Sequence, residues 1–152
     1  MARTGYIEGD DIMVYVDTTG AGTAYQPMAA ATNHKISDKA ETKTSKRKTK
    51  DANASMWDKK TVSGLSRTIT VNGLTTVVEG SDAKYGYYAM LTAMHKGDAV
   101  KVKNSFSTEQ TGDVLQEGMY VITSCELDTP TGQDATWSAT LESTGEITTK
   151  KK

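Results

Sequence analysis

The sequence is poor in the residues on which covalent and metal-based chemistry depends. Its 152 residues include one cysteine, Cys125, which excludes an intramolecular disulfide and a metal cluster held by cysteines. Of its two histidines, His34 lies in a strand-like segment and His95 at the expected end of a helix. Neither stands in a metal-ligand spacing such as HExxH. The sequence therefore predicts no metal site.

Motifs for catalysis and for nucleotide binding are missing as well. The chain has no GxSxG, no Walker loop and no GxGxxG. The run Gly20-Ala21-Gly22 is followed by Thr23-Ala24-Tyr25 and not by the start of a helix, so it does not predict a phosphate-binding loop. We expect a protein that is not an enzyme, with no catalytic residues and no cofactor.

Long apolar runs are also absent. The first residues, 1–6, have no apolar core and do not resemble a secretory signal. No run approaches the roughly 18 apolar residues that cross a membrane. We expect no membrane partner and assembly of the protein in a cytoplasm.

Hydroxyl-bearing residues are abundant. Threonine accounts for 24 of the 152 residues, hydrophobic residues make up 36%, and the net charge is −1. Threonine is β-branched and polar, so it suits a pleated surface with one solvated face. The composition predicts a single β-rich domain over residues 1–152, with wet faces available to partners.

Period-two patterns predict strands in both halves of the chain. In the first strand, residues 11–17, Ile12, Val14 and Val16 share one side. A second strand is expected from Met28 to residue 36, with Pro27 at its start or on a sheet edge. Further strands are expected at residues 62–74, where Asn72-Gly73 predicts a turn, and at residues 99–103.

One segment has helical periodicity. Residues 82–96 combine a capping Ser81 or Asp82 with the C-terminal stop Lys96-Gly97. The apolar stripe expected to pack on the sheet is Tyr87, Leu91 and Met94, flanked by Tyr88 and Ala89.

The last third predicts a β-hairpin. Residues 118–127 and 135–142 have period-two patterns and are joined by Pro130-Thr131-Gly132. Trp137 and Leu141 lie on the face expected to be buried. In the first strand of the hairpin, Cys125 is expected to be a small buried apolar residue in register with Met119, Val121 and Leu127. We expect a core containing Trp137, Leu141, Ile69, Val71, Val121 and Leu91.

Residues 35–60 interrupt the strand pattern with a basic stretch. Nine basic and four acidic residues give it a local charge of about +5, against −1 for the chain. We expect a long polar loop at about residues 37–57, part of which can extend as a hairpin arm. Three interpretations remain open: a solvated loop, a nucleic-acid contact through phosphates, and an arm that docks on a neighbouring copy.

The order of these elements resembles that of phage major tail tube proteins of the siphophage type, whose fold contractile-tail and secretion tubes share. The motifs are Trp57 after the long loop, Gly64-Leu65-Ser66 in the next strand, and Gly97 before a valine-rich strand. A Gly-led final hairpin follows, and then Gly145-Glu146-Ile147 with a polar tail, expected to be flexible, over residues 146–152. The resemblance implies a β-sandwich or barrel with one flanking α-helix and a long polar loop.

The resemblance further implies a structural virion protein. Tail tube proteins form homohexameric rings that stack into a helical filament, a tube through which DNA passes from the capsid to the host during ejection. The implied partners are other copies of the chain, the tape measure protein, the tail terminator, and baseplate or tip proteins. Phage DNA would pass through the lumen without specific binding.

Two sets of residues follow from that role. A lumen that passes DNA favours carboxylates and hydroxyls over lysine and arginine. The lumen-facing candidates are Glu126, Asp128, Thr136, Ser138, Thr140 and Glu142. The inter-ring loop candidates are Lys43, Lys46, Arg47, Lys48 and Lys50.

Two alternatives remain beside this interpretation. One is a nucleic-acid-binding β-barrel that uses the basic stretch 35–60 as its contact surface. The other is the tube protein of a contractile tail or of a secretion-type injection apparatus.

Overall fold

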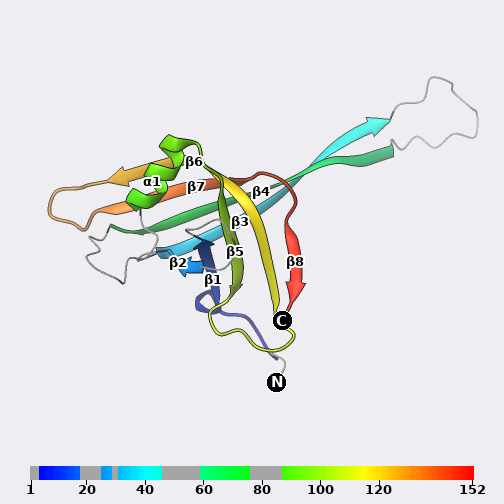
Figure 1. Ribbon diagram of the computed structural model, residues 1–152, viewed down its shortest axis with the longest axis horizontal. Helices are drawn as coiled ribbons and strands as arrows, with labels where there is room; N and C mark the ends of the chain where they lie inside the picture. Colours follow the sequence, from blue (N-terminus) through cyan, green and yellow to red (C-terminus); the bar gives the residue numbers. More distant parts are fainter. Residues whose placement is uncertain (1–3, 18–24, 29–30, 46–58, 76–86) are drawn as a thin grey trace, which may run out of the picture.

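The structure is a computed structural model, and it describes residues 4–17, 25–28, 31–45, 59–75 and 87–152. Within these residues the chain forms eight strands of one sheet, all paired antiparallel, and one α-helix (Figure 1). The mainly β fold with a single helix was predicted and is confirmed. The elements are η1 (Gly9–Asp11), β1 (Ile12–Asp17), β2 (Tyr25–Pro27), β3 (Ala31–Ser45), β4 (Lys59–Leu74), α1 (Tyr87–Lys96), β5 (Val100–Phe106), β6 (Val114–Asp128), β7 (Thr136–Ser143) and β8 (Thr148–Lys151).

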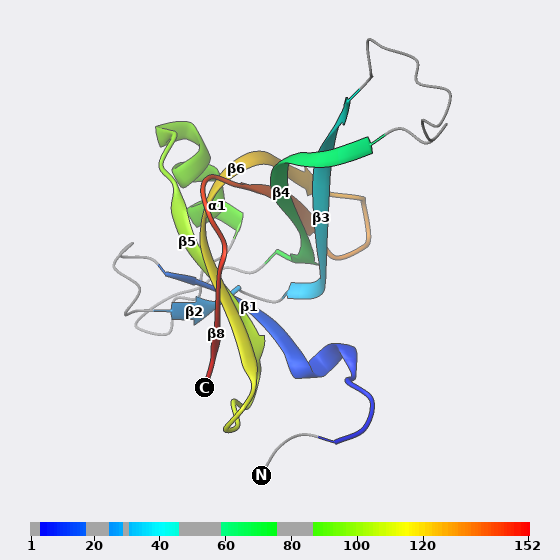
Figure 2. The same ribbon diagram turned by 90° about the vertical axis from the view of Figure 1, so that its right-hand side faces the viewer.

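Strand β6 divides the sheet into two parts that share it. The strand order is β2-β1-β5-β6-β7-β4-β3, and β8 also pairs with β6. The first half of β6 pairs with β5 and β8, whereas its second half, from Tyr120 to Asp128, pairs with β7. Figures 1 and 2 show that β3, β4 and β7 run in a different direction from β1, β5 and β8. The sheet therefore folds over at β6 and encloses a core.

The core lies between these two parts and under the helix. Apolar side chains from six elements and Met28 are buried in one cluster, and α1 contacts β6 and β7. The period-two pattern of β1 is confirmed by Val14 and Val16, both fully buried. The buried apolar residues are Val14, Val16, Met28, Ile69, Val71, Met90, Val100, Val102, Tyr120, Ile122, Trp137, Ala139 and Leu141.

Two strand boundaries differ from the prediction. The segment from Pro27 to Ile36 belongs to two strands: Pro27 ends β2, an edge strand, and Ile36 lies in β3. Asn72 and Gly73 do not form a turn, because β4 continues through them and pairs Gly73 with Trp137. A local turn signal is overridden here by pairing with β3 and β7 on both sides.

A β-bulge in β6 makes one core prediction wrong. Thr123 is an extra residue between the pairs Ile122–Leu141 and Ser124–Thr140. Before the bulge the even-numbered residues Tyr120 and Ile122 face the core, and Val121 faces away. After the bulge the odd-numbered Cys125 lies on the core side, opposite Ala139. The predicted register thus holds only for the second half of β6, and Val121 is only partly buried.

The helix is rotated from the predicted orientation. Met90 is its fully buried residue, whereas Leu91, predicted for the core, is only partly buried. Tyr87 and Met94 pack against the core as predicted. The predicted C-terminal stop is confirmed: Gly97 has φ 73° and its N–H donates to the carbonyl of Met94. The expected caps Ser81 and Asp82 lie outside the described residues.

The predicted loop at 37–57 is strand for part of its length. β3 continues to Ser45 and β4 starts at Lys59, and the two strands pair with each other throughout. β4 pairs with β7 only from Thr68 onward, so the β3–β4 hairpin projects from the body as an arm (Figure 1). We call residues 39–45 and 59–66 the arm. Residues 46–58 lie outside the described residues.

The chain end is not the flexible tail expected for residues 146–152. Thr148–Lys151 form β8, which pairs with Val114–Glu117 of β6. Gly118 makes this return possible, because a Cβ there would lie 2.6 Å from Cδ1 of Ile147. The Ile147 side chain packs against the core over this glycine and holds the chain beside β6.

Candidate assembly surfaces

The part of the sheet formed by β3, β4, β7 and the second half of β6 has one face directed away from the core. On β7, Trp137, Ala139 and Leu141 are buried, so Thr136, Ser138, Thr140 and Glu142 lie on the opposite face. We call this opposite face of the four strands the outer face. The helix and the other strands pack on the core side of the sheet.

The structure brings the six lumen-facing candidates together on the outer face. Glu126 pairs with Ser138 and Asp128 pairs with Thr136 in the β6–β7 ladder. The Ser138 hydroxyl lies 3.5 Å from Oε2 of Glu126. All three carboxylates, Glu126, Asp128 and Glu142, are exposed. The sequence-based grouping is thus reproduced in space, and what the face meets in an assembly remains a prediction.

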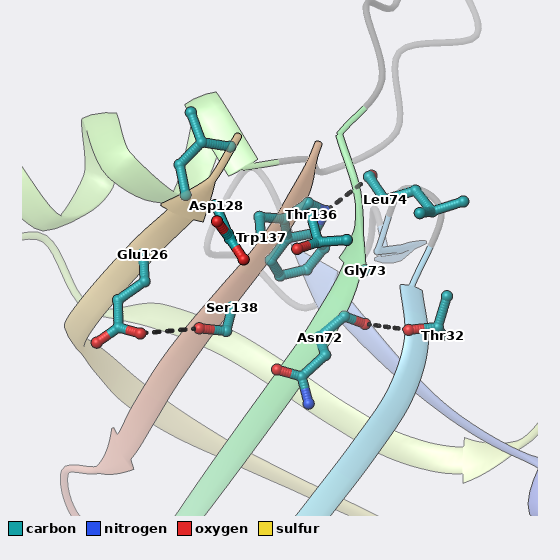
Figure 3. Close-up of a pocket in the computed structure, with 10 residues that line it drawn as sticks. Thr32, Asn72, Gly73, Leu74, Glu126, Asp128, Thr136, Trp137 and Ser138 are labelled. Carbon is teal, nitrogen blue, oxygen red and sulfur yellow. Dashed lines mark hydrogen bonds between the residues drawn. The ribbon is translucent and has the colours of Figure 1, made fainter. Parts of the chain in front are cut away.

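A groove lies at one end of the outer face, where Figure 3 shows carboxylates and hydroxyls gathered beside Trp137. Its volume is about 540 Å³. The Trp137 indole N–H donates to the Leu74 carbonyl at 2.9 Å, and this bond joins β7 to the end of β4. The Thr32 hydroxyl donates to the Asn72 carbonyl at 3.3 Å and joins the start of β3 to β4. Hydrogen bonds therefore join the strands beneath the groove, and polar side chains lie around it.

Sequence reasoning missed the contribution of β3 and β4 to the outer face. The register places Thr68, Thr70 and Asn72 of β4 beside β7 on this face, and Lys35 of β3 beside Thr70. The alternation of Thr68 and Thr70 with the buried Ile69 and Val71 was the available signal. Where all four strands lie side by side, Lys35 is the one basic residue of this face among the described residues; Lys39, Lys43 and Lys59 lie on the same side farther out, in the arm.

Lys103 of β5 does not neutralise the outer-face carboxylates. Lys103 instead forms an ion pair with Glu109 at 3.1 Å, and its ammonium lies over the Tyr15 and Tyr25 rings. Hydrogen bonds from Lys103 and Lys152 lower the pKa of Glu109. The ion pairs found among the described residues include none of Glu126, Asp128 and Glu142.

In the part of the sheet formed by β3, β4, β7 and the second half of β6, two strand edges are unpaired among the described residues. β3 pairs with β4 on one side, and no described strand lies on its other side. β5 pairs with β6 only up to Tyr120, so residues 121–128 of β6 have β7 as their one partner. Open edges of this length are templates for pairing with another chain.

The arm is the third feature, and Arg67 fixes its base. The Arg67 guanidinium binds Asp38 of β3 at two points, one of them Nη2–Oδ2 at 2.8 Å, and donates to Gln116 of β6 at 2.6 Å. Hydrogen bonds from Arg67 lower the pKa of Asp38. Sequence reasoning missed this cluster, because its members are far apart in the chain. Of the inter-ring candidates, Lys43 lies exposed on β3, and Lys46, Arg47, Lys48 and Lys50 lie outside the described residues.

The described residues contain no arrangement suited to catalysis. No group of three or more His, Cys, Asp or Glu among them is placed to hold a metal ion. Burial lowers the pKa of His34, whose Nε2 has no hydrogen-bond partner, and burial raises the pKa of the Cys125 thiol. In the part of the chain that the structure describes, no helix is long and apolar enough to cross a membrane.

Open strand edges, an uncovered polar face and a projecting arm are features of a protein built to assemble with other protein subunits. The family model for phage tail tube proteins matches residues 6–149, and the chain belongs to this family. The resemblance drawn from the sequence is thereby confirmed. The protein is a structural component of the virion tail tube and not an enzyme.

Solved structures with the same fold include several tail proteins. A chain in the tail of an empty gene transfer agent particle, refined with C6 helical symmetry, is 20% identical with a TM-score of 0.71; the match covers 94% of this chain and 98% of that chain. The SPP1 tail tube is 14% identical with a TM-score of 0.70, covering 97% and 80%. A chain of the anti-feeding prophage baseplate is 8% identical with a TM-score of 0.62, covering 99% and 98%. No curated protein sequence matches the chain.

Proposed function

We propose that the protein, acting as one tail-tube unit over its whole length, forms six-fold rings that stack into a tube for DNA ejection. The family membership and the likeness to a tail with C6 symmetry support this assembly. The observation that carries it is the pair of open edges on one four-stranded part of the sheet.

Ring closure follows from the direction of these strands. The order is β6, β7, β4 and β3, and each neighbour is antiparallel to the last. Because the strand direction alternates over four strands, β6 at one edge is antiparallel to β3 at the other. When a copy is rotated about a ring axis, its β6 edge meets the β3 edge of the next copy in antiparallel orientation. One heterologous contact, repeated, then closes the ring and removes both edges.

The outer face of such a ring lines the channel. A closed barrel has its core-directed face against α1 and the rest of the subunit, which leaves the outer face for the lumen. Where all four strands lie side by side, this face carries Glu126, Asp128 and Glu142 against one described lysine, Lys35. Carboxylates repel phosphates and hydroxyls bind them weakly, so DNA moves past this face without specific contacts.

The remaining partners follow from the position of a tube in a virion. We propose the tape measure protein inside the tube during assembly, the tail terminator at one end, and baseplate or tip proteins at the other.

Negative-stain images of the purified protein at high concentration test the proposal. Rings or tubes with six-fold symmetry are expected. A protein that stays monomeric or dimeric at every concentration, and that retards DNA in a salt-sensitive way, would overturn it in favour of nucleic-acid binding through residues 35–60.

A further inference from the structure

The inner side of the arm carries two large apolar side chains, Leu65 and Val62, that the described residues leave uncovered. The core-facing side of β4 continues from Ile69 past Arg67 to Leu65 and, beyond a bulge, to Val62. Ile69 is buried, but 81% of Leu65 and 61% of Val62 are exposed. Figure 1 shows the arm projecting beyond the body of the subunit, so these apolar side chains lie outside the core.

A groove marks the point where this surface meets the body. It has a volume of about 410 Å³ and lies beside the Arg67–Asp38 pair. Leu65 forms one wall, and Gly145, Glu146 and Ile147 of the turn before β8 contribute to the other. Apolar and polar atoms both line it, which suits a side chain with an apolar body and a polar tip.

A second pair of exposed apolar side chains lies in the segment that precedes β1. Tyr6 is fully exposed and Ile7 is 57% exposed, and they precede Glu8, Asp10 and Asp11. Figures 1 and 2 both place the dark-blue segment that leads into β1 well away from the arm. The segment therefore does not lie against the arm of its own copy.

The segment and the arm as a whole carry opposite net charges, and Lys60 lies on the inner side of the arm with Val62. The arm carries Lys39, Lys43, Lys59 and Lys60 against Glu41, which is four minus one, or +3. Residues 4–11 carry three carboxylates and no basic side chain, which is −3. Opposite charges around two exposed apolar pairs give both attraction and a preferred register.

We propose that residues 4–11 of one copy bind the inner side of the arm of another copy, with Tyr6 and Ile7 against Leu65, Val62 and the groove. In a ring or a stack of rings, each copy gives its segment to one neighbour and receives on its arm the segment of another, so the contact propagates from copy to copy. The proposal deepens the proposed tube by naming one of the contacts that join its subunits.

Disulfide trapping tests the contact. Ile7→Cys and Leu65→Cys are introduced together in a Cys125→Ser background, and the protein is oxidised at assembling concentrations. Each copy then has one thiol on the segment and one on the arm, so a ladder beyond the dimer is expected on a non-reducing gel. Either single-cysteine variant yields dimers at most. Tyr88→Cys, on the exposed side of α1, replaces Leu65→Cys in the matched control and yields no ladder.

Charge reversal gives an independent measurement. Asp10→Lys and Lys60→Glu, both exposed, each weaken the trapping, and the two together restore it. Electron microscopy of the same samples separates this inference from the proposed tube. A ladder without rings would sustain the contact and overturn the tube, whereas tubes without a ladder would overturn the contact.

Discussion

Arg67 and Asp38 face each other across β4 and β3, and the pair is asymmetric in its exposure. The Arg67 side chain is 10% exposed, and the Asp38 side chain is 61% exposed. The backbone N–H of Arg67 also donates to the Ser143 hydroxyl at 2.9 Å, while its guanidinium reaches Gln116. Four strands therefore meet at one arginine, at the point where the arm leaves the body.

Arg67→Lys is expected to destabilise the subunit by about 1–2 kcal/mol, because an ammonium cannot reproduce the two-point contact with Asp38 and also reach Gln116. Urea denaturation of the monomer measures this loss. Lys59→Ala, at an exposed site on the arm, is the control and changes the free energy of unfolding by less than about 0.5 kcal/mol. Equal stability of Arg67→Lys and the unchanged protein would show that the cluster does not hold the arm.

Lowering the pH tests the Arg67–Asp38 pair, because it protonates the Asp38 carboxylate. The pKa of Asp38 is lowered from its ordinary 3.8 in the folded protein, mainly by hydrogen bonds from Arg67. The folded state thus binds a proton less readily than the unfolded state. The contribution of Asp38 is present above pH 4 or so and is lost as the pH falls through the lowered pKa.

Asp38→Asn therefore reduces the fall in unfolding free energy between about pH 5 and pH 3. Denaturant titrations at several pH values measure it, with Asp98→Asn, on an exposed residue after α1, as the control. The interpretation fails if both variants follow the pH profile of the unchanged protein.

Trp137→Ala is expected to cost about 3–5 kcal/mol, as for other large aromatic side chains truncated in a core. Trp137 is 2% exposed and its indole N–H donates to Leu74. Trp137→Phe retains much of the packing but leaves the Leu74 carbonyl without this donor, so it should cost less. Thermal unfolding compares the two, and Leu127→Ala, at an exposed position opposite Trp137, should cost least. An unchanged melting temperature for Trp137→Ala would contradict the position of this residue in the core.

The double substitution Glu126→Lys and Glu142→Lys tests the outer face as a channel lining. Both side chains are exposed on that face, so subunit folding and tube assembly should stay near normal. Six copies of each lysine in every ring would attract phosphates and slow DNA release from complete virions. The readouts are tube length by microscopy and the rate of DNA release. Asp98→Lys, at an exposed residue after α1 and away from this face, is the control, and normal release by the double variant would place other strands in the lumen.

The sequence predicted most of the strands because burial on one face leaves a period-two pattern. Val14 and Val16, Ile69 and Val71, and Trp137 and Leu141 were all assigned correctly on this basis. The outer-face residues of β6 and β7 followed from the same alternation. The single helix was predicted from its apolar stripe, and its end from the Lys96-Gly97 pair.

The errors arose where distant parts of the chain decide the outcome. Val121 was misplaced because the bulge at Thr123 becomes visible only when β6 is paired with β7. Leu91 was preferred to Met90 because several rotations of an apolar helix are equally periodic, and the shape of the sheet selects one. The Arg67–Asp38–Gln116 cluster joins residues 29 and 49 positions apart, and no local pattern connects them.

The extra residue Thr123 has a consequence for comparing distant members of this family. At 14–20% identity, alignments are decided largely by where gaps are placed. A one-residue gap in β6 exchanges the two faces of every position beyond it, because side chains alternate. An alignment that ignores the bulge would align Glu126 and Asp128 with buried positions. It would align Cys125, which packs against the core, with a solvent-exposed position. Alignments of tail tube sequences should therefore be anchored separately on each side of residue 123.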